Sequence, residues 1–112
     1  MKWTDLATES DLAEIIANSF NQPQAIYKHS VTCGTSGHVK MMLDGADAPE
    51  NMVFHYLDLL ANRALSNKIA ETFNVHHESP QILVIKDGKC VYHTSHLAIR
   101  MEKIVQFAES VA

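Results

Sequence analysis

The sequence predicts an α/β fold, a mixed four-stranded sheet with helices on both faces. Two observations support this prediction. Amphipathic helical segments alternate along the chain with short apolar runs, and Asp87-Gly88 separates the last two of these runs as a tight hairpin turn would. The 112 residues, 46% of them hydrophobic, are enough for one core and too few for two ordinary domains. We therefore expect a single domain over residues 1–112.

Four segments have the apolar spacing of amphipathic helices. Their apolar positions are Leu12, Ile15, Ile16 and Phe20; Val39, Met42, Leu43 and Ala46; Leu65, Ile69 and Phe73; and Met101, Ile104, Val105 and Ala108. Thr8 or Ser10 is the candidate N-cap of the first helix and Asn62 that of the third, because both positions precede the apolar stripe with a capping side chain.

Four short runs between these helices are expected to be strands, at residues 24–29, 52–59, 82–86 and 89–93. The first two are joined through a helix and should run parallel, whereas the hairpin pair must be antiparallel. This is the arrangement of the thioredoxin-like fold. A two-residue turn pairs Ile85 with Cys90 and, extrapolated along the hairpin, Pro80 with Ser95.

The charge balance bounds the partners and the location of the chain. Nine Lys and Arg against 13 Asp and Glu give a net charge of −4, which argues against nucleic acid or an anionic membrane surface as a partner. No apolar run has the length of a membrane span, and the N-terminal residues lack the apolar segment of a signal peptide. We expect a cytoplasmic protein whose two cysteines are reduced.

Cys33 lies where the first strand ends and the second helix begins. Backbone N–H groups in the first turn of a helix lack intrahelical partners and favour a thiolate. Thr35 and Ser36 are expected to stabilise that thiolate, Ser36 by a hydrogen bond to the sulfur. A hydroxyl cannot attack an oxidised Cys33, so the chemistry would stop at a mixed disulfide until an external thiol arrives. The alternative is that Cys33 is a small buried apolar residue.

Cys90 is not expected to form a disulfide with Cys33. The hairpin register places it level with Ile85, five strand residues or about 16 Å from Pro80, whereas a disulfide needs Cα atoms within roughly 7 Å. We assign Cys90 to sheet packing. The same register brings Ser95 and His96 to the Cys33 end of the sheet, where His96 could meet an anionic thiol. The histidines and cysteines lack the spacing of a zinc site, so no bound metal is expected.

Four segments resemble the YtxJ-like family, the monothiol bacilliredoxins. They are K-H-S-V-T-C-G-T-S at 28–36, L-S-N-K-I-A at 65–70, H-H-E-S-P-Q-I-L-V-I-K-D-G-K at 76–89 and H-T-S-H at 93–96. The resemblance implies a thioredoxin-like protein whose Cys33 removes bacillithiol from S-thiolated client proteins. It also implies that Pro80 is a cis-proline facing the sulfur and that Ser79 offers backbone groups to the incoming chain.

The resemblance further implies that a low-molecular-weight thiol such as bacillithiol is a co-substrate rather than a tightly bound cofactor. We expect Thr32 and Gly34, on either side of the cysteine, to contact the substrate together with Ser79, Pro80, Ser95 and His96. The family usually has proline where this chain has Gly34. Two alternatives remain at this stage: an iron-sulfur protein of the monothiol glutaredoxin type, suggested by Cys33-Gly34-Thr35-Ser36, and a non-catalytic scaffold of the same fold.

Overall fold

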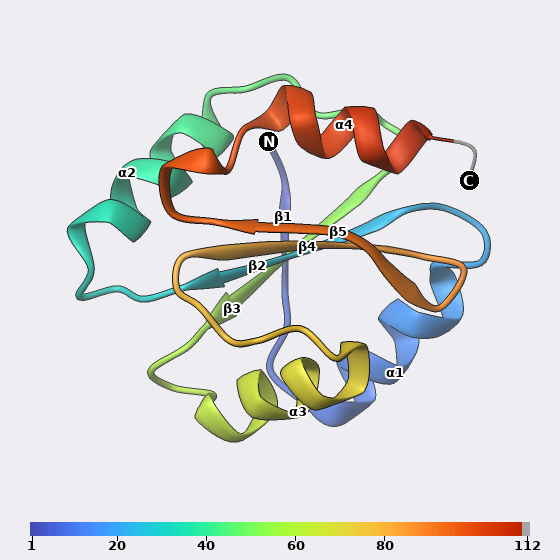
Figure 1. Ribbon diagram of the computed structural model, residues 1–112, viewed down its shortest axis with the longest axis horizontal. Coiled ribbons are helices and arrows are strands. Elements are labelled where there is room, and N and C mark those ends of the chain that lie inside the picture. The colour runs from blue at the N-terminus through green and yellow to red at the C-terminus, as the bar shows by residue number, and fades with distance from the viewer. Residues whose placement is uncertain (111–112) are drawn as a thin grey trace.

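A mixed five-stranded sheet forms the centre of the molecule in the computed structural model, which describes residues 1–110 (Figure 1). The strand order is β1-β3-β2-β4-β5. β1, β3 and β2 run parallel to one another, β4 is antiparallel to β2, and β5 is antiparallel to β4. The elements are β1 (Trp3–Asp5), α1 (Glu9–Asn18), β2 (Gln24–His29), α2 (Gly34–Asp44), β3 (Val53–Asp58), α3 (Arg63–Phe73), β4 (Gln81–Lys86), β5 (Lys89–Ser95), the 3-10 turn η1 (His96–Ala98) and α4 (Met101–Glu109).

The thioredoxin-like arrangement of the predicted elements is confirmed, with one strand more than the four expected. The additional strand, β1, is three residues long and pairs Trp3 with Phe54 at the edge of the sheet. A three-residue segment is too short for its side-chain alternation to be recognised in a sequence. It becomes a strand because β3 offers it a hydrogen-bonding edge and because the Trp3 ring packs on Phe54 and Tyr27.

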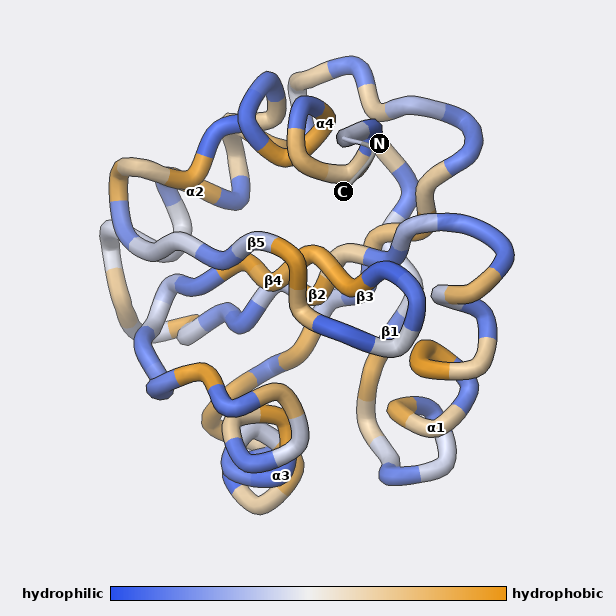
Figure 2. Tube along the Cα trace, turned by 45° about the vertical axis from the view of Figure 1, so that its right-hand side comes forward, coloured by the Kyte–Doolittle hydropathy of each residue, from blue (hydrophilic) through white to orange (hydrophobic). Residues whose placement is uncertain are grey.

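Two apolar clusters, one on each face of the sheet, hold the layers together. On one face, α2 and α4 contribute Val39, Leu43, Ile104 and Ala108. On the other face, α1 and α3 contribute Leu12, Ile15, Leu65 and Ile69. The two pairs of helices lie above and below the sheet in Figure 1. Many residues of the strands between them are hydrophobic, shown in orange in Figure 2. Because β2 and β4 are covered on both faces, five of their twelve positions on the two strands carry Ile, Leu or Val.

Two residues that were predicted to lie on the buried faces of helices, Phe20 and Met42, are exposed. α1 ends at Asn18, so Phe20 no longer follows the helical stripe and is 62% exposed over the hairpin turn. Met42 is 49% exposed because Val39 and Leu43 define the buried stripe of α2. Met42 is one residue from Leu43, which is about 100° around the helix. At the start of α1, Thr8 rather than Ser10 is the N-cap, and it forms a reciprocal capping box with Asp11.

A β-bulge changes the register predicted for the hairpin. Lys86 pairs with Lys89 and Ile85 with Cys90 as expected, but Val84 pairs with Tyr92, so Val91 is the extra residue. Ser95 therefore lies opposite Gln81 instead of Pro80. The carbonyl oxygen of Pro80 accepts a hydrogen bond from the N–H of His96 at 3.0 Å. A bulge of this kind depends on sheet twist and on packing against α4, which the spacing of apolar residues does not record.

His55 is a buried histidine whose pKa makes stability depend on pH. Its side chain is 7% exposed, and Nε2 lies 2.7 Å from Oε1 of Gln24. Burial lowers the pKa of His55 from 6.5 to about 4. Between these values the unfolded histidine binds a proton that the folded one rejects. His55 therefore has no effect on the free energy of unfolding above pH 6.5, and it lowers that free energy as the pH falls towards 4.

We predict that lowering the pH from 7 to about 4.5 costs the wild type about 2 to 3 kcal/mol of unfolding free energy through His55. Urea unfolding at the two pH values measures this loss. His55→Gln, which keeps a polar side chain beside Gln24, should lose that much less over the same interval. Equal losses in the two proteins would contradict the assignment.

Candidate functional site

Cys33 is the N-cap residue of α2 and the only cysteine at this end of the sheet among residues 1–110. Its backbone is extended, with φ −99° and ψ 119°. Its N–H donates to the Ser30 carbonyl at 3.1 Å, and its carbonyl accepts from the Gly37 N–H at 3.0 Å. The thiol is free and partly exposed, and no side chain caps the first turn of α2. The unpaired N–H groups of that turn therefore face an anion at this position without a competing side chain.

The segment that enters β4 lies beside the Cys33 end of β2. The last residues of β2 pair with the first of β4, with Lys28 opposite Gln81. The Ser79-Pro80 peptide bond is cis, as the family resemblance implied, and Pro80 is buried. The Ser79 hydroxyl oxygen is also buried and has no hydrogen-bond partner among residues 1–110. The Ser79-Pro80 segment thus borders the candidate site, and its Ser79 hydroxyl has no hydrogen-bond partner among these residues.

η1 closes the site from the other side. It begins at His96 and packs against α2 (Figure 1). His96 is exposed, has a left-handed backbone with φ 56°, and is tied to the proline segment through the bond to the Pro80 carbonyl. Ser95 donates a hydrogen bond to the Glu78 carboxylate, which lowers the pKa of Glu78. Ser95 and His96 therefore belong to this end of the sheet as predicted, although Ser95 is engaged with Glu78.

The Ser36 hydroxyl points into the protein and does not form the hydrogen bond to the Cys33 sulfur that was expected. Ser36 is fully buried. Its oxygen accepts the Ser30 N–H at 3.0 Å and lies 2.7 Å from Nδ1 of His29. Within residues 1–110 no hydrogen bond joins it to the Cys33 sulfur, so the expected bond to the thiolate is absent. Ser36 instead anchors the first turn of α2 to the end of β2. Thr32 and Thr35 are exposed beside Cys33, and their roles stay predictions.

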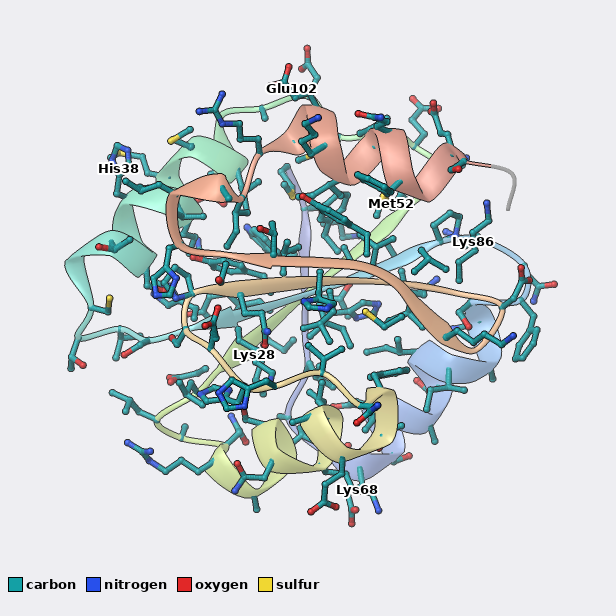
Figure 3. The ribbon with its side chains drawn as sticks, in the orientation of Figure 1. Lys28, His38, Met52, Lys68, Lys86 and Glu102 are labelled. Carbon is teal, nitrogen blue, oxygen red and sulfur yellow. The ribbon has the colours of Figure 1, made fainter. Side chains whose placement is uncertain are left out.

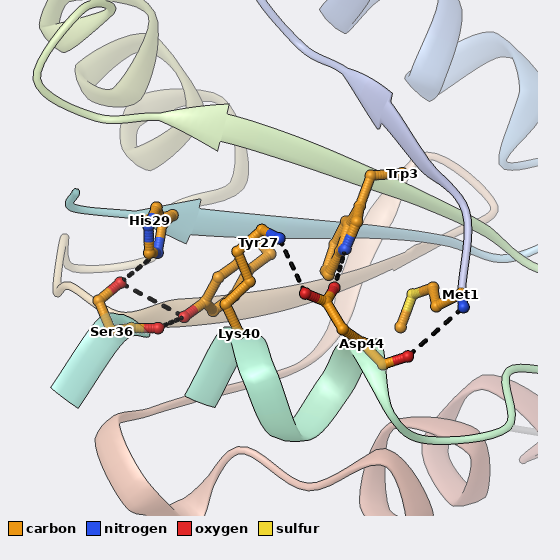
Figure 4. A network of polar contacts seen from close by, with 7 residues as sticks. All are labelled: Met1, Trp3, Tyr27, His29, Ser36, Lys40 and Asp44. Atoms are coloured by element: carbon orange, nitrogen blue, oxygen red, sulfur yellow. Dashed lines mark hydrogen bonds and ion pairs between the residues drawn. The ribbon is translucent and has the colours of Figure 1, made fainter. Parts of the chain in front are cut away.

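Tyr27 and His29 complete a buried polar network beneath α2 that the sequence did not reveal (Figure 4). The Tyr27 hydroxyl donates to the Ser36 carbonyl at 2.8 Å, and burial raises the pKa of Tyr27 to about 12. Burial, and next the positive charge of Lys40, lowers the pKa of His29. A neutral phenol and a neutral imidazole thus hold Ser36. Their one signal in the sequence is alternation, which places residues 27 and 29 on the same face of β2.

Lys40, Asp44 and Trp3 fix the rest of α2 against the sheet edge (Figure 4). Lys40 forms an ion pair with Asp44 at 3.0 Å and lies 5.8 Å from the centre of the Trp3 ring. The indole N–H of Trp3 donates to the Asp44 carboxylate. These contacts join β1 to α2 and hold the helix that presents Cys33.

Cys90 packs against the apolar cluster beneath α1 and α3, as predicted. It lies opposite Ile85, and its thiol donates to the Tyr92 carbonyl at 3.3 Å. Burial raises the pKa of Cys90 to about 11. A thiol with that pKa is almost entirely protonated at neutral pH and is a poor nucleophile.

Residues 1–110 contain neither a cluster of metal ligands nor a membrane-spanning helix. No group of three or more His, Cys, Asp or Glu side chains in this part of the chain is arranged to hold a metal ion. No helix among the same residues has the length and apolar character needed to cross a bilayer.

The fold and the site define a thioredoxin-fold protein with a single cysteine at the start of its α2 helix. A protein family described as Monothiol bacilliredoxin BrxC matches residues 4–104. The chain therefore belongs to the monothiol bacilliredoxin family, as its sequence resemblance indicated, and a thiol redox role follows from the family and the fold.

Solved structures share the thioredoxin fold of this chain. A proposed oxidoreductase with a thioredoxin fold is 28% identical, covers 96% of this chain and 94% of its own, and superposes with a TM-score of 0.84. Fasciola hepatica thioredoxin is 23% identical over 92% of this chain and 97% of its own, with a TM-score of 0.74. An N21Q mutant thioredoxin from Halobacterium salinarum is 14% identical over 99% and 95%, with a TM-score of 0.75. The two thioredoxins share the fold alone with this chain.

We predict that Ser36→Ala lowers the unfolding free energy by about 2 kcal/mol or more, because it leaves the Ser30 N–H and the His29 ring nitrogen buried without their partner. Urea unfolding measures the change. Thr35→Ala, at the neighbouring exposed position, is the matched control and should stay within about 0.5 kcal/mol of wild type. A Ser36→Ala protein as stable as the control would contradict the anchoring role.

We predict that Gly34→Pro raises the unfolding free energy by about 0.5 to 1 kcal/mol. Gly34 is the first residue of α2, where proline is favoured, and no other group lies within 4 Å of an added Cβ atom. The extended backbone of Cys33 already suits a residue that precedes proline. Gly37→Pro, one turn further into the same helix, should destabilise the protein because it removes the hydrogen bond to the Cys33 carbonyl. Destabilisation by Gly34→Pro would contradict this prediction.

Proposed function

We propose that this protein removes a low-molecular-weight thiol, bacillithiol or a close analogue, from S-thiolated proteins through a mixed disulfide on Cys33. The observation that carries the proposal is the position of Cys33. It is a free, partly exposed thiol at the uncapped start of α2, at the same end of the sheet as the cis Ser79-Pro80 peptide and the exposed His96. Membership of the monothiol bacilliredoxin family supports the choice of thiol.

The reaction is two successive thiol–disulfide exchanges. In the first, the Cys33 thiolate attacks the sulfur of the small thiol in the mixed disulfide. A bond forms between these two sulfurs, the bond to the client breaks, and the client cysteine leaves as a thiolate that takes a proton from water. In the second, a free small thiol attacks the adduct, releases Cys33, and departs as the symmetrical disulfide. Ser36 cannot take the place of that free thiol, because it carries no sulfur.

The substrate would lie between three parts of the site. Thr32 and Gly34 flank the sulfur, and neither is buried. Ser79 and Pro80 would meet the client backbone, and His96 would meet the negative charge of the small thiol. The imidazole of His96 is exposed and is held at the site by its backbone bond to Pro80. Ser95 would act by keeping Glu78 bound to β5 rather than by touching the substrate.

The partners proposed here are S-thiolated client proteins and the small thiol, which acts as a co-substrate. A net charge of −4 suits these partners better than nucleic acid or an anionic membrane. The chemistry requires a compartment in which protein thiols are reduced, so we propose that the protein works in the cytoplasm.

We predict that wild-type protein incubated with a bacillithiolated peptide gains the mass of one bacillithiol and that Cys33→Ser gains none. The adduct should disappear when free bacillithiol is added. Intact-mass spectrometry follows both steps. Cys90→Ser is the control and should form the adduct like wild type, because the Cys90 thiol packs against the apolar cluster on the opposite side from Cys33 and its pKa is raised to about 11. An adduct of equal yield in Cys33→Ser, or none in wild type, would refute the proposal.

A further inference from the structure

Lys28 is a lysine near the end of β2 with its side chain inside the protein. The residue is 0% exposed and lies on the face of β2 that packs against α3 (Figure 3). Its amino group donates to the Ser66 carbonyl at 3.2 Å and lies 3.2 Å from Nδ1 of His77. The Ser66 hydroxyl lies 3.3 Å from the same nitrogen and can either donate to it or accept from it. Among residues 1–110 no carboxylate forms an ion pair with it. Lys68, by contrast, is on the outer side of α3.

An apolar side chain at position 28 would be better suited to stability alone. Burial lowers the pKa of Lys28 to about 8, which records the cost of removing an ammonium group from water. Replacing such buried charges with apolar residues of similar size is often neutral or stabilising. The neighbouring positions on this face, Ile26 and Leu83, are apolar. The amino group therefore calls for an explanation other than packing.

Gln81 is the second buried polar residue at this place. It pairs with Lys28 across the two strands. Its amide nitrogen donates to the His76 carbonyl at 2.9 Å, and its amide oxygen accepts from the Glu78 N–H at 3.5 Å. Lys28 and Gln81 thus bind the same short segment, residues 76–78, from the ends of two adjacent strands. We name these two side chains and their contacts the loop clasp.

The segment held by the loop clasp leads directly to Ser79 and the cis Pro80. We propose that Lys28 is a positioning residue, which through His77 holds the segment before Pro80 in the geometry that receives the substrate at Cys33. The proposal rests on the function proposed above. Lys28 itself is buried and does not touch the substrate. Its amino group donates to His77, so the clasp requires Nδ1 of His77 to carry no proton.

The test compares Lys28→Met with wild type in steady-state transfer of bacillithiol from a bacillithiolated peptide, with free bacillithiol as the second thiol. Because the loop loses one hydrogen bond that orders it, KM for the peptide should rise about fivefold while kcat stays the same. Methionine fills the buried space, so the variant should unfold at a urea concentration near that of wild type. A wild-type KM in Lys28→Met would overturn the proposal.

Variants of the partner and a matched control separate positioning from general damage. His77→Gln keeps an acceptor and should retain the wild-type KM, whereas His77→Leu should behave like Lys28→Met, and the double variant should be no worse than either single one. Lys86→Met removes a lysine at the far end of β4, whose amino group donates to the carbonyls of Ala108 and Ser110 at the end of α4. Its KM should equal that of wild type. An equal rise in KM in Lys86→Met would overturn the proposal.

A spectroscopic measurement decides the clasp independently of activity. In nitrogen-15 NMR spectra at neutral pH, His77 of wild type should be neutral with its proton on Nε2, and Lys28→Met should shift this signal towards a mixture of tautomers. A proton on Nδ1 in wild type would overturn the proposal. If wild type transfers no thiol, the proposed function fails, and the His77 signal still confirms or overturns the clasp.

Discussion

The antiparallel pairing of β2 with β4 is the constraint on which the site depends. β2 ends at His29, and β4 begins at Gln81, its neighbour across the sheet being Lys28. Because the two strands run in opposite directions, the chain that leaves β2 towards Cys33 and the chain that enters β4 through Pro80 lie at the same end of the sheet. The β4–β5 hairpin then returns the chain to that end of the sheet at His96. The three parts of the site are thus brought together by backbone pairing, before any side chain contributes.

Buried polar groups at the end of β2 fix the two segments beside it, the start of α2 and the segment before Pro80. On one face, Tyr27 and His29 hold the start of α2 through Ser36. On the other face, Lys28 binds α3 and the segment before Pro80. Such groups cost free energy when they leave water, and they specify one geometry when their hydrogen bonds are complete. The end of β2 therefore gives up apolar packing at the place where the position of Cys33 and of the proline segment must be fixed.

Ser36 explains why the protein can be limited to one-thiol chemistry. In a Cys-x-x-Cys motif this position would carry the second thiol. Here it is fully buried, and its hydroxyl is already engaged with Ser30 and His29. The position is part of the structure that supports α2 rather than a group free to reach the sulfur. Completion of the reaction must then depend on a thiol from outside the chain, which agrees with the family to which the protein belongs.

The sequence by itself determined the features that depend on neighbouring residues along the chain. The helical stripes, the Asp87-Gly88 turn and the position of Cys33 before α2 are of this kind, because periodicity, turn chemistry and helix ends are local properties. The resemblance to a family added the cis Ser79-Pro80 bond. Only the tertiary structure decided the edge strand β1, the bulge at Val91, the inward direction of Ser36 and the burial of Lys28. Each of these depends on a partner from another element, and residue spacing carries no record of which groups meet across the sheet.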